Sequence, residues 1–217
     1  EVKRLPARVA RTMAAMGGAR ALMERLVALE RRSADQDAEI LQLRVKRGLD
    51  LLSDKRELLT GERAAELMGG APEDATAVRL GSKSFGQDAA EEAAKVLRRL
   101  QNVEWADMSD IIAGRPEAEA LEVLKCMCGA LPAAKLKAID LSENALGEKG
   151  IRALEPVLRS LEALEEIKFM NDGLSELSVR LLAEYLPVEH LRTLHFHNNM
   201  SGSGGAVAAA AIVAKCD

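Results

Sequence analysis

The chain has 217 residues, of which 48% are hydrophobic but only 2% aromatic, so a large core has to be built mainly from aliphatic side chains. The formal net charge of −4 argues against general electrostatic binding to nucleic acid. No apolar run reaches the roughly 18 residues that a membrane-spanning helix needs, and no signal peptide is evident.

The first 48 residues predict a helical segment. Leu22, Leu26 and Leu29 recur at helical spacing within residues 5–33, and further apolar residues continue the pattern to Val45. The segment forms either two helices or one long kinked helix, with a coiled-coil-like seam. It is either a solvated helix packed on a neighbour or a helix that binds another protein partner.

Residues 49–74 predict the cap of a repeat array. Residues 49–52 have the pattern of a short strand, and Thr60 has the features of an N-cap for a short helix that ends at Met68. Residues 69–72, which include two glycines and a proline, form the turn that follows. This irregular strand and helix would close one end of the array.

From residue 75 to 217, one pattern occurs about five times, and the last copy is truncated. The pattern L-x-x-L-x-L-x-x-N-x-L-G is clearest from Leu136 to Gly147. The copies begin at Ala75, Val103, Leu136, Leu164 and Leu191. Since the chain starts at Glu1 rather than Met and ends inside a copy, we expect it to be a piece of a longer protein.

Each copy predicts one strand followed by one helix. Ile139 and Leu141 alternate as in a strand with one buried face, and an amphipathic helix follows. Such units bury their apolar faces only by stacking, so the sequence predicts an α/β leucine-rich repeat solenoid, a right-handed, ribonuclease-inhibitor-like horseshoe with strands on its concave side. Asn144 and Asn199 suit the corner after the strand, whereas Lys83, Ile111 and Asp172 depart from asparagine there.

Two further features concern the helices. Pro156 is expected to bend or interrupt the helix of the third repeat. Cys126 and Cys128 lie in an apolar helical stretch, where we interpret them as small core residues of a reduced, intracellular protein rather than as a disulfide or metal site.

Charged residues fall at concave or rim positions of the repeats and form a mixed face. This face is either a solvated surface or a surface complementary to a basic patch on a partner. His195 and His197 point the same way, but no carboxylate or thiol is placed beside them, so no metal site is expected. The candidate partner-binding residues on this face are Asp107, Asp110, Asp140, Glu143, Lys168, Asp172 and His197.

The step between the second and third copies is about five residues longer than the others. We place the extra residues at 114–119 (GRPEAE), just past the strand, in a rim loop of the kind that contacts partners. Arg115 is expected to project from this loop. The alternative is that Arg115 only precedes the helix, with Pro116 at its first position and two glutamates in its first turn.

Several stretches go beyond a generic repeat, among them 78–86 (VRLGSKSFG), 107–121 (DMSDIIAGRPEAEAL), 169–173 (FMNDG) and 194–200 (LHFHNNM). Together they resemble the leucine-rich repeat domain of Ran GTPase-activating proteins, particularly those of plants and green algae. The resemblance covers about residues 49–214, and we identify no resemblance for residues 1–48.

The resemblance implies a Ran-type small GTPase as partner, on which the chain stimulates GTP hydrolysis without an arginine finger. It assigns Arg115 to the interface and Asn171 to the catalytic position, where its amide helps to orient the partner's catalytic glutamine. It implies no cofactor of the chain's own and a cytoplasmic location, with a perinuclear one as an option.

A second hypothesis is a non-catalytic scaffold that has kept the repeat frame. Residues 1–48 lack the Trp-Pro-Pro signature found at the N-terminus of the plant proteins. In this interpretation the N-terminal helices attach the chain to a cytoskeletal or ciliary assembly.

Overall fold

In the computed structural model, residues 48–53 and 55–213 are described. They belong to one compact unit, Val45–Asp217. The helical segment was predicted for residues 1–48, of which only Gly48 is among the described residues. Among the residues described, no helix has both the length and the apolar composition needed to cross a lipid bilayer.

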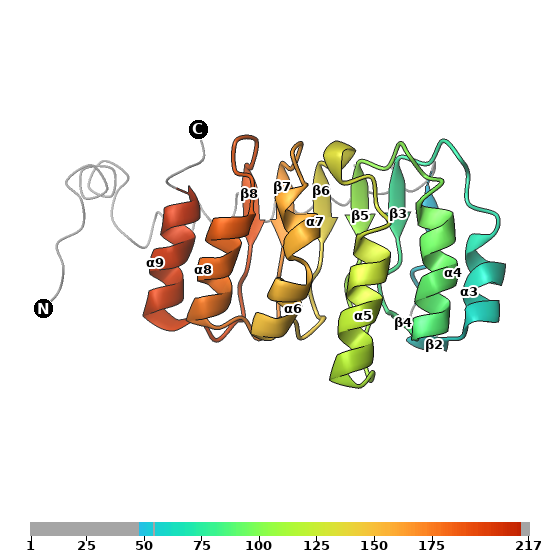
Figure 1. Cartoon of the computed structure of the whole chain (residues 1–217), viewed down its shortest axis with the longest axis horizontal. Helices are drawn as coiled ribbons and strands as arrows, with labels where there is room; N and C mark the ends of the chain where they lie inside the picture. Colours follow the sequence, from blue (N-terminus) through green and yellow to red (C-terminus); the bar gives the residue numbers. More distant parts are fainter. Residues whose placement is uncertain (1–47, 54, 214–217) are drawn as a thin grey trace, which may run out of the picture. The chain divides into compact units, whose positions relative to one another are not determined.

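The unit is a leucine-rich repeat solenoid. Six parallel strands form one sheet in the order β1-β3-β5-β6-β7-β8, and the helices stand in a row along one side of it (Figure 1). The strands are β1 (Leu49–Asp50), β3 (Ala77–Arg79), β5 (Trp105–Asp107), β6 (Ala138–Asp140), β7 (Glu166–Lys168) and β8 (Thr193–His195). The helices are α3 (Gly61–Met68), α4 (Gln87–Leu97), α5 (Glu117–Cys128), α6 (Gly147–Ala153), α7 (Glu155–Arg159), α8 (Glu176–Tyr185) and α9 (Gly202–Val213).

The register of the sheet confirms the repeat alignment made from the sequence. The central strand residues lie opposite one another in pairs along the sheet, in the order Val78, Ala106, Ile139, Ile167 and Leu194. In the sequence, a helix lies between each of these residues and the next, because parallel strands need a crossover connection. The fold class predicted from the period is therefore confirmed as an α/β solenoid.

Residues 49–68 form a short strand, Leu49–Asp50, and the helix α3, which ends at Met68 as predicted. Thr60 is the N-cap of α3, where its hydroxyl accepts a hydrogen bond from the Arg63 N–H at 3.4 Å. A second sheet of two strands, β2 (Glu57–Leu59) and β4 (Lys83–Phe85), joins this cap to the first regular repeat. Lys83 stands at the corner position, which is asparagine in two of the other repeats, and donates to the Ser53 hydroxyl at 2.7 Å.

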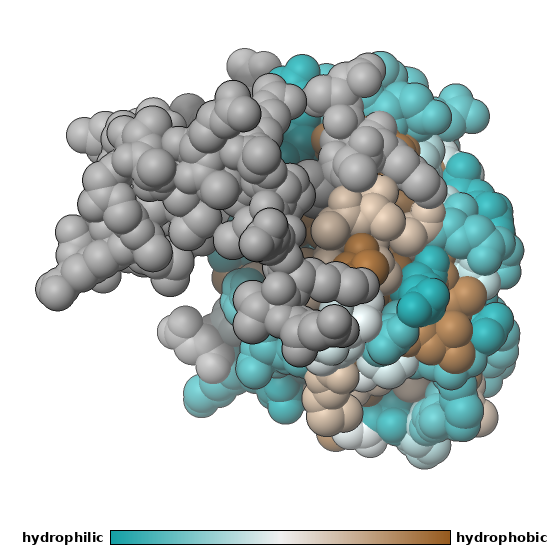
Figure 2. All heavy atoms as spheres, turned by 90° about the vertical axis from the view of Figure 1, so that its left-hand side faces the viewer, coloured by the Kyte–Doolittle hydropathy of each residue, from teal (hydrophilic) through white to brown (hydrophobic). Residues whose placement is uncertain are grey.

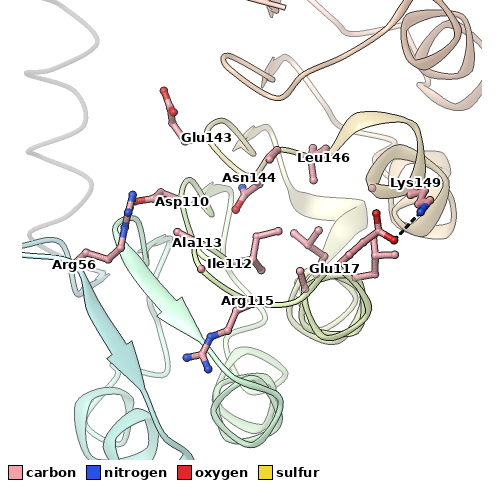
Figure 3. A pocket seen from close by; sticks show the side chains of 16 residues that line it. Arg56, Asp110, Ile112, Ala113, Arg115, Glu117, Glu143, Asn144, Leu146 and Lys149 are labelled. Atoms are coloured by element: carbon pink, nitrogen blue, oxygen red, sulfur yellow. Dashed lines mark hydrogen bonds and ion pairs between the residues drawn. The ribbon is translucent and has the colours of Figure 1, made fainter.

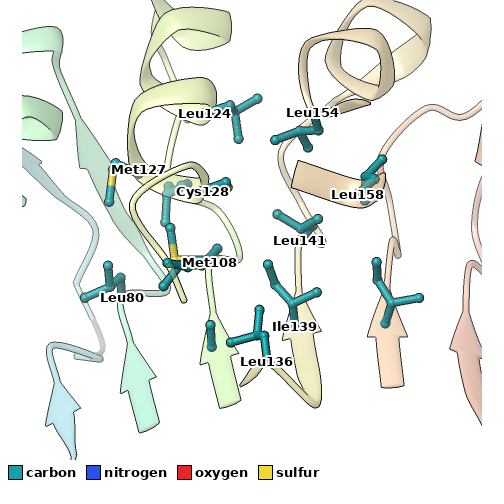
Figure 4. Close-up of a cluster of buried hydrophobic side chains, with 14 of the residues drawn as sticks. Leu80, Met108, Leu124, Met127, Cys128, Leu136, Ile139, Leu141, Leu154 and Leu158 are labelled. Atoms are coloured by element: carbon teal, nitrogen blue, oxygen red, sulfur yellow. The ribbon is translucent and has the colours of Figure 1, made fainter. Parts of the chain in front are cut away.

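The core is a continuous aliphatic layer between the sheet and the helices (Figure 4). The residue after each strand turns inward, as Leu80, Met108, Leu141 and Phe169 do, and all four are almost wholly buried. These side chains occupy equivalent positions in successive repeats, so each packs against those of its neighbours. The repeats therefore share one core. Cys128 lies in this layer, and burial raises the pKa of its thiol to about 12, as expected for an inert core residue.

Pro156 interrupts the third helix as predicted. The helix divides into α6 and α7 at Leu154, two residues before the proline. Proline has no N–H, and its ring clashes with the carbonyl four residues earlier, which is that of Arg152. The outer layer of this repeat therefore consists of two short helices.

The extra length of the second repeat is not confined to residues 114–119, as the sequence analysis placed it. Nine residues separate β5 from α5, whereas six or seven separate strand from helix in the other repeats. Nine residues also separate α5 from β6, and these include the 3-10 turn Ala133–Lys135, whereas six to eight make the corresponding connections elsewhere. A period counted between strands gives only the total length, so it could not divide the insertion between two loops.

The end of the stack at α9 has exposed apolar surface. Figure 2 shows hydrophobic patches among polar residues on this face. Met200 and Val207 are 81% and 70% exposed. The helix has small residues along its length, which suits close packing against α8 on its other side.

A ladder of corner side chains ties the repeats together. In three successive steps, a corner side-chain oxygen accepts the backbone N–H of the preceding corner residue: Ile111 to Asn144, Asn144 to Asp172, and Asp172 to Asn199. The Asn144 amide also donates to the carbonyls of Met108 and Leu141 at 2.8 and 2.7 Å. Asn144 is buried, so these bonds satisfy backbone groups that water cannot reach.

Replacing Asn144 by alanine should destabilise the unit by about 2–4 kcal/mol, because several buried backbone groups lose their partner at about 1–3 kcal/mol each. Urea unfolding would measure this. Asn102→Ala is the matched control, since Asn102 is exposed and only accepts a bond from Lys135; it should cost less than about 0.5 kcal/mol. Equal effects of the two substitutions would contradict a structural role for the ladder.

Candidate interaction surface on the open face and rim

The face of the sheet opposite the helices carries a row of charged residues. Arg79, Asp107, Asp140, Lys168 and His195 lie in register on successive strands, so one charged or polar side chain follows another across the sheet. We call these residues the open-face row. It contains both signs of charge, as the sequence predicted, with acidic residues at its centre.

Asp107, near the centre of the row, is held by the residue two positions after it. Its Oδ1 accepts from the Ser109 hydroxyl at 2.6 Å and from the Ser109 N–H at 3.0 Å. Burial, assisted by the neighbouring charge of Asp140, raises the pKa of Asp107 above its ordinary value, although Ser109 and Arg79 oppose the shift. Arg79 lies 3.8 Å from Asp107 and 3.6 Å from Asp50, so its positive charge is shared between two carboxylates.

The turns that follow the strands form the rim, and each contains a residue in the left-handed backbone region. These residues occupy the same place in five repeats, with φ between 54° and 63°: Ser82, Asp110, Glu143, Asn171 and Asn198. Because the backbone has the same conformation in each turn, these five side chains leave it in the same direction. Candidate residues from different repeats are thus brought into a second row, which we call the rim row.

Asn171 lies between two members of the rim row. Its amide nitrogen donates to the Glu143 carboxylate, and its amide oxygen accepts from the Asn198 amide. A side-chain amide has two donors and two acceptor lone pairs, so one N–H and one lone pair remain after these bonds. Glu143 and Asn198 therefore fix the orientation of the Asn171 amide. Its nitrogen can still donate one hydrogen bond to a partner, and its oxygen can still accept one.

Asn198 and Arg56 belong to this surface but were not identified from the sequence. Asn198 stands 27 positions after Asn171, so the repeat spacing could have found it. Arg56, from the cap, donates to the Asp110 carboxylate at 2.5 and 3.0 Å, and only 13% of the Asp110 side chain is exposed. The sequence had no signal for this pairing, because Arg56 lies outside the repeat pattern.

Arg115 does not project from its loop, in contrast to the prediction. Its guanidinium turns toward the cap, donating to the Ser84 hydroxyl and carbonyl at 3.0 and 2.9 Å and to the Leu59 carbonyl at 3.4 Å. Glu119 lies 3.7 Å away, and 19% of the arginine side chain is exposed. The alternative interpretation, a residue before the helix, fits better, although Pro116 is the N-cap of α5 rather than its first residue.

The loop around Arg115 borders a cleft of about 440 Å³ (Figure 3). The Arg56–Asp110 pair stands at one side and the Glu117–Lys149 pair, at 2.6 Å, at the other. Ile112 and Leu146 contribute apolar surface, and Arg115 points away from the Asn144 side (Figure 3). The cleft adjoins the rim row at Glu143.

Asp172 was predicted at the surface, and the structure corrects this. The side chain is wholly buried, because the corner position faces the core whereas the residue before it faces the rim. Lys168 lies on the open face, 3.0 Å from Glu166, and His197 is exposed in the last turn. In the described part of the chain, no cluster of histidine, cysteine and acidic side chains could hold a metal ion.

Comparison with known proteins confirms the resemblance. RAN GTPase-activating protein 1 of Arabidopsis thaliana is 48% identical over 96 residues, which is 44% of this chain and 18% of the relative. RAN GTPase-activating protein 2 of the same plant is 43% identical over 122 residues, or 54% of this chain and 22% of the relative. Ran GTPase-activating protein 1 of Xenopus laevis is 33% identical over 121 residues, or 54% and 21%. The chain thus spans about a fifth of the length of these relatives.

No protein-family model matches the sequence. Among solved structures, the chain is similar to the leucine-rich repeat-containing protein LegL7 from Legionella pneumophila. The TM-score is 0.45 and the identity 18%, over 73% of this chain and 51% of that protein.

Arg115→Ala should destabilise the unit by about 1–3 kcal/mol, because the Ser84 and Leu59 carbonyls lose a charged donor. Urea unfolding would measure the change. Arg192→Ala is the control, since Arg192 is 79% exposed and has one distant ion pair, at 3.8 Å; it should cost less than about 0.5 kcal/mol. Unchanged stability in Arg115→Ala would support the projecting arginine that the sequence predicted.

Proposed function

We propose that the chain binds a Ran-type small GTPase through the rim row and the open-face row, and that it stimulates GTP hydrolysis on that partner. The observation that carries the proposal is the position of Asn171, whose amide is held on both sides and keeps hydrogen-bonding capacity toward a partner. The similarity of about half the chain to proteins named Ran GTPase-activating proteins supports it.

In this proposal Asn171 acts on the partner's own machinery. A GTPase with its catalytic glutamine on a mobile segment loses rate whenever the side chain turns away from the attacking water. An amide that is already fixed can bind the glutamine without first becoming ordered, so the ordering cost at binding is small. Asn171 adds orientation rather than charge, and the chain itself needs no nucleotide, metal or other cofactor.

Arg115 has an indirect part in the proposed activity. Because its guanidinium is engaged by Ser84, Leu59 and Glu119, we do not assign it to the nucleotide site of the partner, and the mechanism has no arginine finger. Instead, Arg115 holds the loop between β5 and α5 against the cap. That loop carries Asp110, so the arginine supports one end of the rim row.

Asp107, Asp140 and Glu143 give the centre of the surface its negative potential, whereas Asp110 is paired with Arg56. A basic patch on the partner would be attracted to it, which raises the association rate more than the affinity. Lys168, His195 and His197 lie toward the other end of the surface and restrict the orientations in which the partner can bind. A cytoplasmic or perinuclear location, where such a GTPase would be met, is part of the same proposal.

The second candidate is a scaffold that keeps the surface but has no effect on hydrolysis. It is favoured by the inward position of Arg115, which serves the fold of the free chain. The two candidates differ in one measurable property, since only the first predicts a change in the hydrolysis rate of bound GTP.

A single-turnover assay of GTP hydrolysis on Ran should show acceleration of about 10³-fold or more when the 217-residue chain is added at micromolar concentration. Asn171→Gly removes the amide but suits the left-handed backbone, with φ of 56°, so the turn should persist. Activity should fall by about 10²-fold or more. Binding to Ran loaded with a non-hydrolysable GTP analogue should change by less than about tenfold.

Ser82→Gly is the matched control, because Ser82 occupies the same left-handed position, with φ of 61°, in the first regular repeat. This variant should lower the stimulation by less than about tenfold, because Ser82 lies at one end of the rim row and in this proposal only Asn171 acts on the partner's glutamine. Binding without acceleration would establish the scaffold instead of the activator, and loss of folding in Asn171→Gly would mean that the amide is structural.

A further inference from the structure

Asp172 stands in the ladder where its neighbours are asparagines. Its Oδ1 accepts the Asn144 N–H at 2.9 Å, as the Oδ1 of Asn144 accepts the Ile111 N–H and that of Asn199 accepts the Asp172 N–H, both at 3.0 Å. The three side chains therefore share one orientation. The second oxygen of Asp172 takes the place that the amide nitrogen has in the other two.

That place is surrounded by acceptors. The Asn199 amide nitrogen donates to the carbonyls of Phe169 and Phe196 at 2.7 and 2.6 Å, and Asn144 makes the equivalent pair of bonds. By the same register, the carbonyls of Leu141 and Phe169 face the second oxygen of Asp172. This oxygen is buried and has no hydrogen-bond partner. A carboxylate oxygen would be repelled there, whereas a hydroxyl would donate as the amides do.

We infer that Asp172 is an uncharged carboxylic acid in the folded chain, that its hydroxyl replaces the ladder amide, and that it is the positioning residue for Asn171. The positioning role rests on the proposed function, whereas the protonation state does not. Asp172 can position Asn171 because the two are adjacent in one turn. Its own N–H and its Oδ1 also tie that turn to the repeats on either side.

The charges around Asp172 favour the neutral form. Asp140 and Glu143 on the preceding repeat are both negative, and on the following repeat the ladder group is the uncharged Asn199. The cation of its own strand, Lys168, lies 3.0 Å from Glu166, and His197 stands in the next rim turn. Burial, with smaller contributions from Asp140 and Glu143, raises the pKa of Asp172 to about 8, against the backbone N–H groups of Asn144 and Leu146.

The sign of the pH dependence follows from this difference. The unfolded carboxyl has a pKa of about 3.9, so between about pH 4 and 8 the folded chain binds one proton more than the unfolded chain. The contribution of Asp172 to stability is therefore full at low pH and is lost as pH rises through this window. The folding equilibrium constant falls by up to about tenfold for each pH unit.

Asp172→Asn supplies the amide permanently and should remove this dependence. In urea unfolding at pH 5, 7 and 9, the gain in stability of Asp172→Asn over the unmodified chain should grow with pH. The infrared difference between the two proteins at pH 7 should contain the carbonyl stretch of a protonated carboxylic acid. A constant difference in stability at all three pH values, with no such band, would overturn the protonation state.

Asp172→Ala is the second variant, since it removes both the acceptor and the donor. In the hydrolysis assay on Ran, stimulation by the unmodified chain should fall between pH 7 and 9 relative to Asp172→Asn. Asp172→Ala should be impaired at every pH, with Asn at this position restoring activity. Equal pH profiles for the unmodified chain and Asp172→Asn would overturn the positioning role. Absence of stimulation by every protein would reject the proposed function, while the unfolding and infrared results would still decide the protonation state.

Discussion

The structure depends on one constraint, the need to satisfy backbone groups where each short strand ends. Strands of two or three residues make few backbone hydrogen bonds with their neighbours. Without a further partner, the turn after each strand would leave buried N–H and C=O groups unbonded. A side chain that both accepts and donates closes this gap, as Asn144 does between the second and third repeats. Once the corner residue is fixed, the residue directly before it points to the rim, and the hydrophobic residue that follows the strand points into the core.

Much of this could be read from the sequence because it depends on spacing. The strand register, the interruption of the third helix at Pro156 and the cap at Thr60 each follow from a local rule that the surrounding structure does not override. The repeat alignment also fixes which residue precedes the corner, although Asn171 itself was singled out by the family resemblance. Asn198 could have been found by the same reasoning.

What the sequence could not supply were contacts between the regular repeats and the irregular cap. Arg115 was expected to project, yet its nearest acceptors are Ser84 and Leu59, more than 30 and 50 positions away, in strands whose pairing has no periodic signal. The pairing of Arg56 with Asp110 has the same origin. The burial of Asp172 was missed for a different reason, because its acidic character was given more weight than the buried corner position that the alignment assigned to it.

The left-handed residues of the rim have a consequence for how recognition can change. A non-glycine residue in this conformation costs of order 1 kcal/mol, which the ladder and the core beneath it offset. Since the backbone of the turn is held from below, the side chain at its tip contributes little to the fold. The rim behaves as a set of interchangeable positions on a fixed frame, so a new binding preference can arise from single substitutions there without reshaping the solenoid.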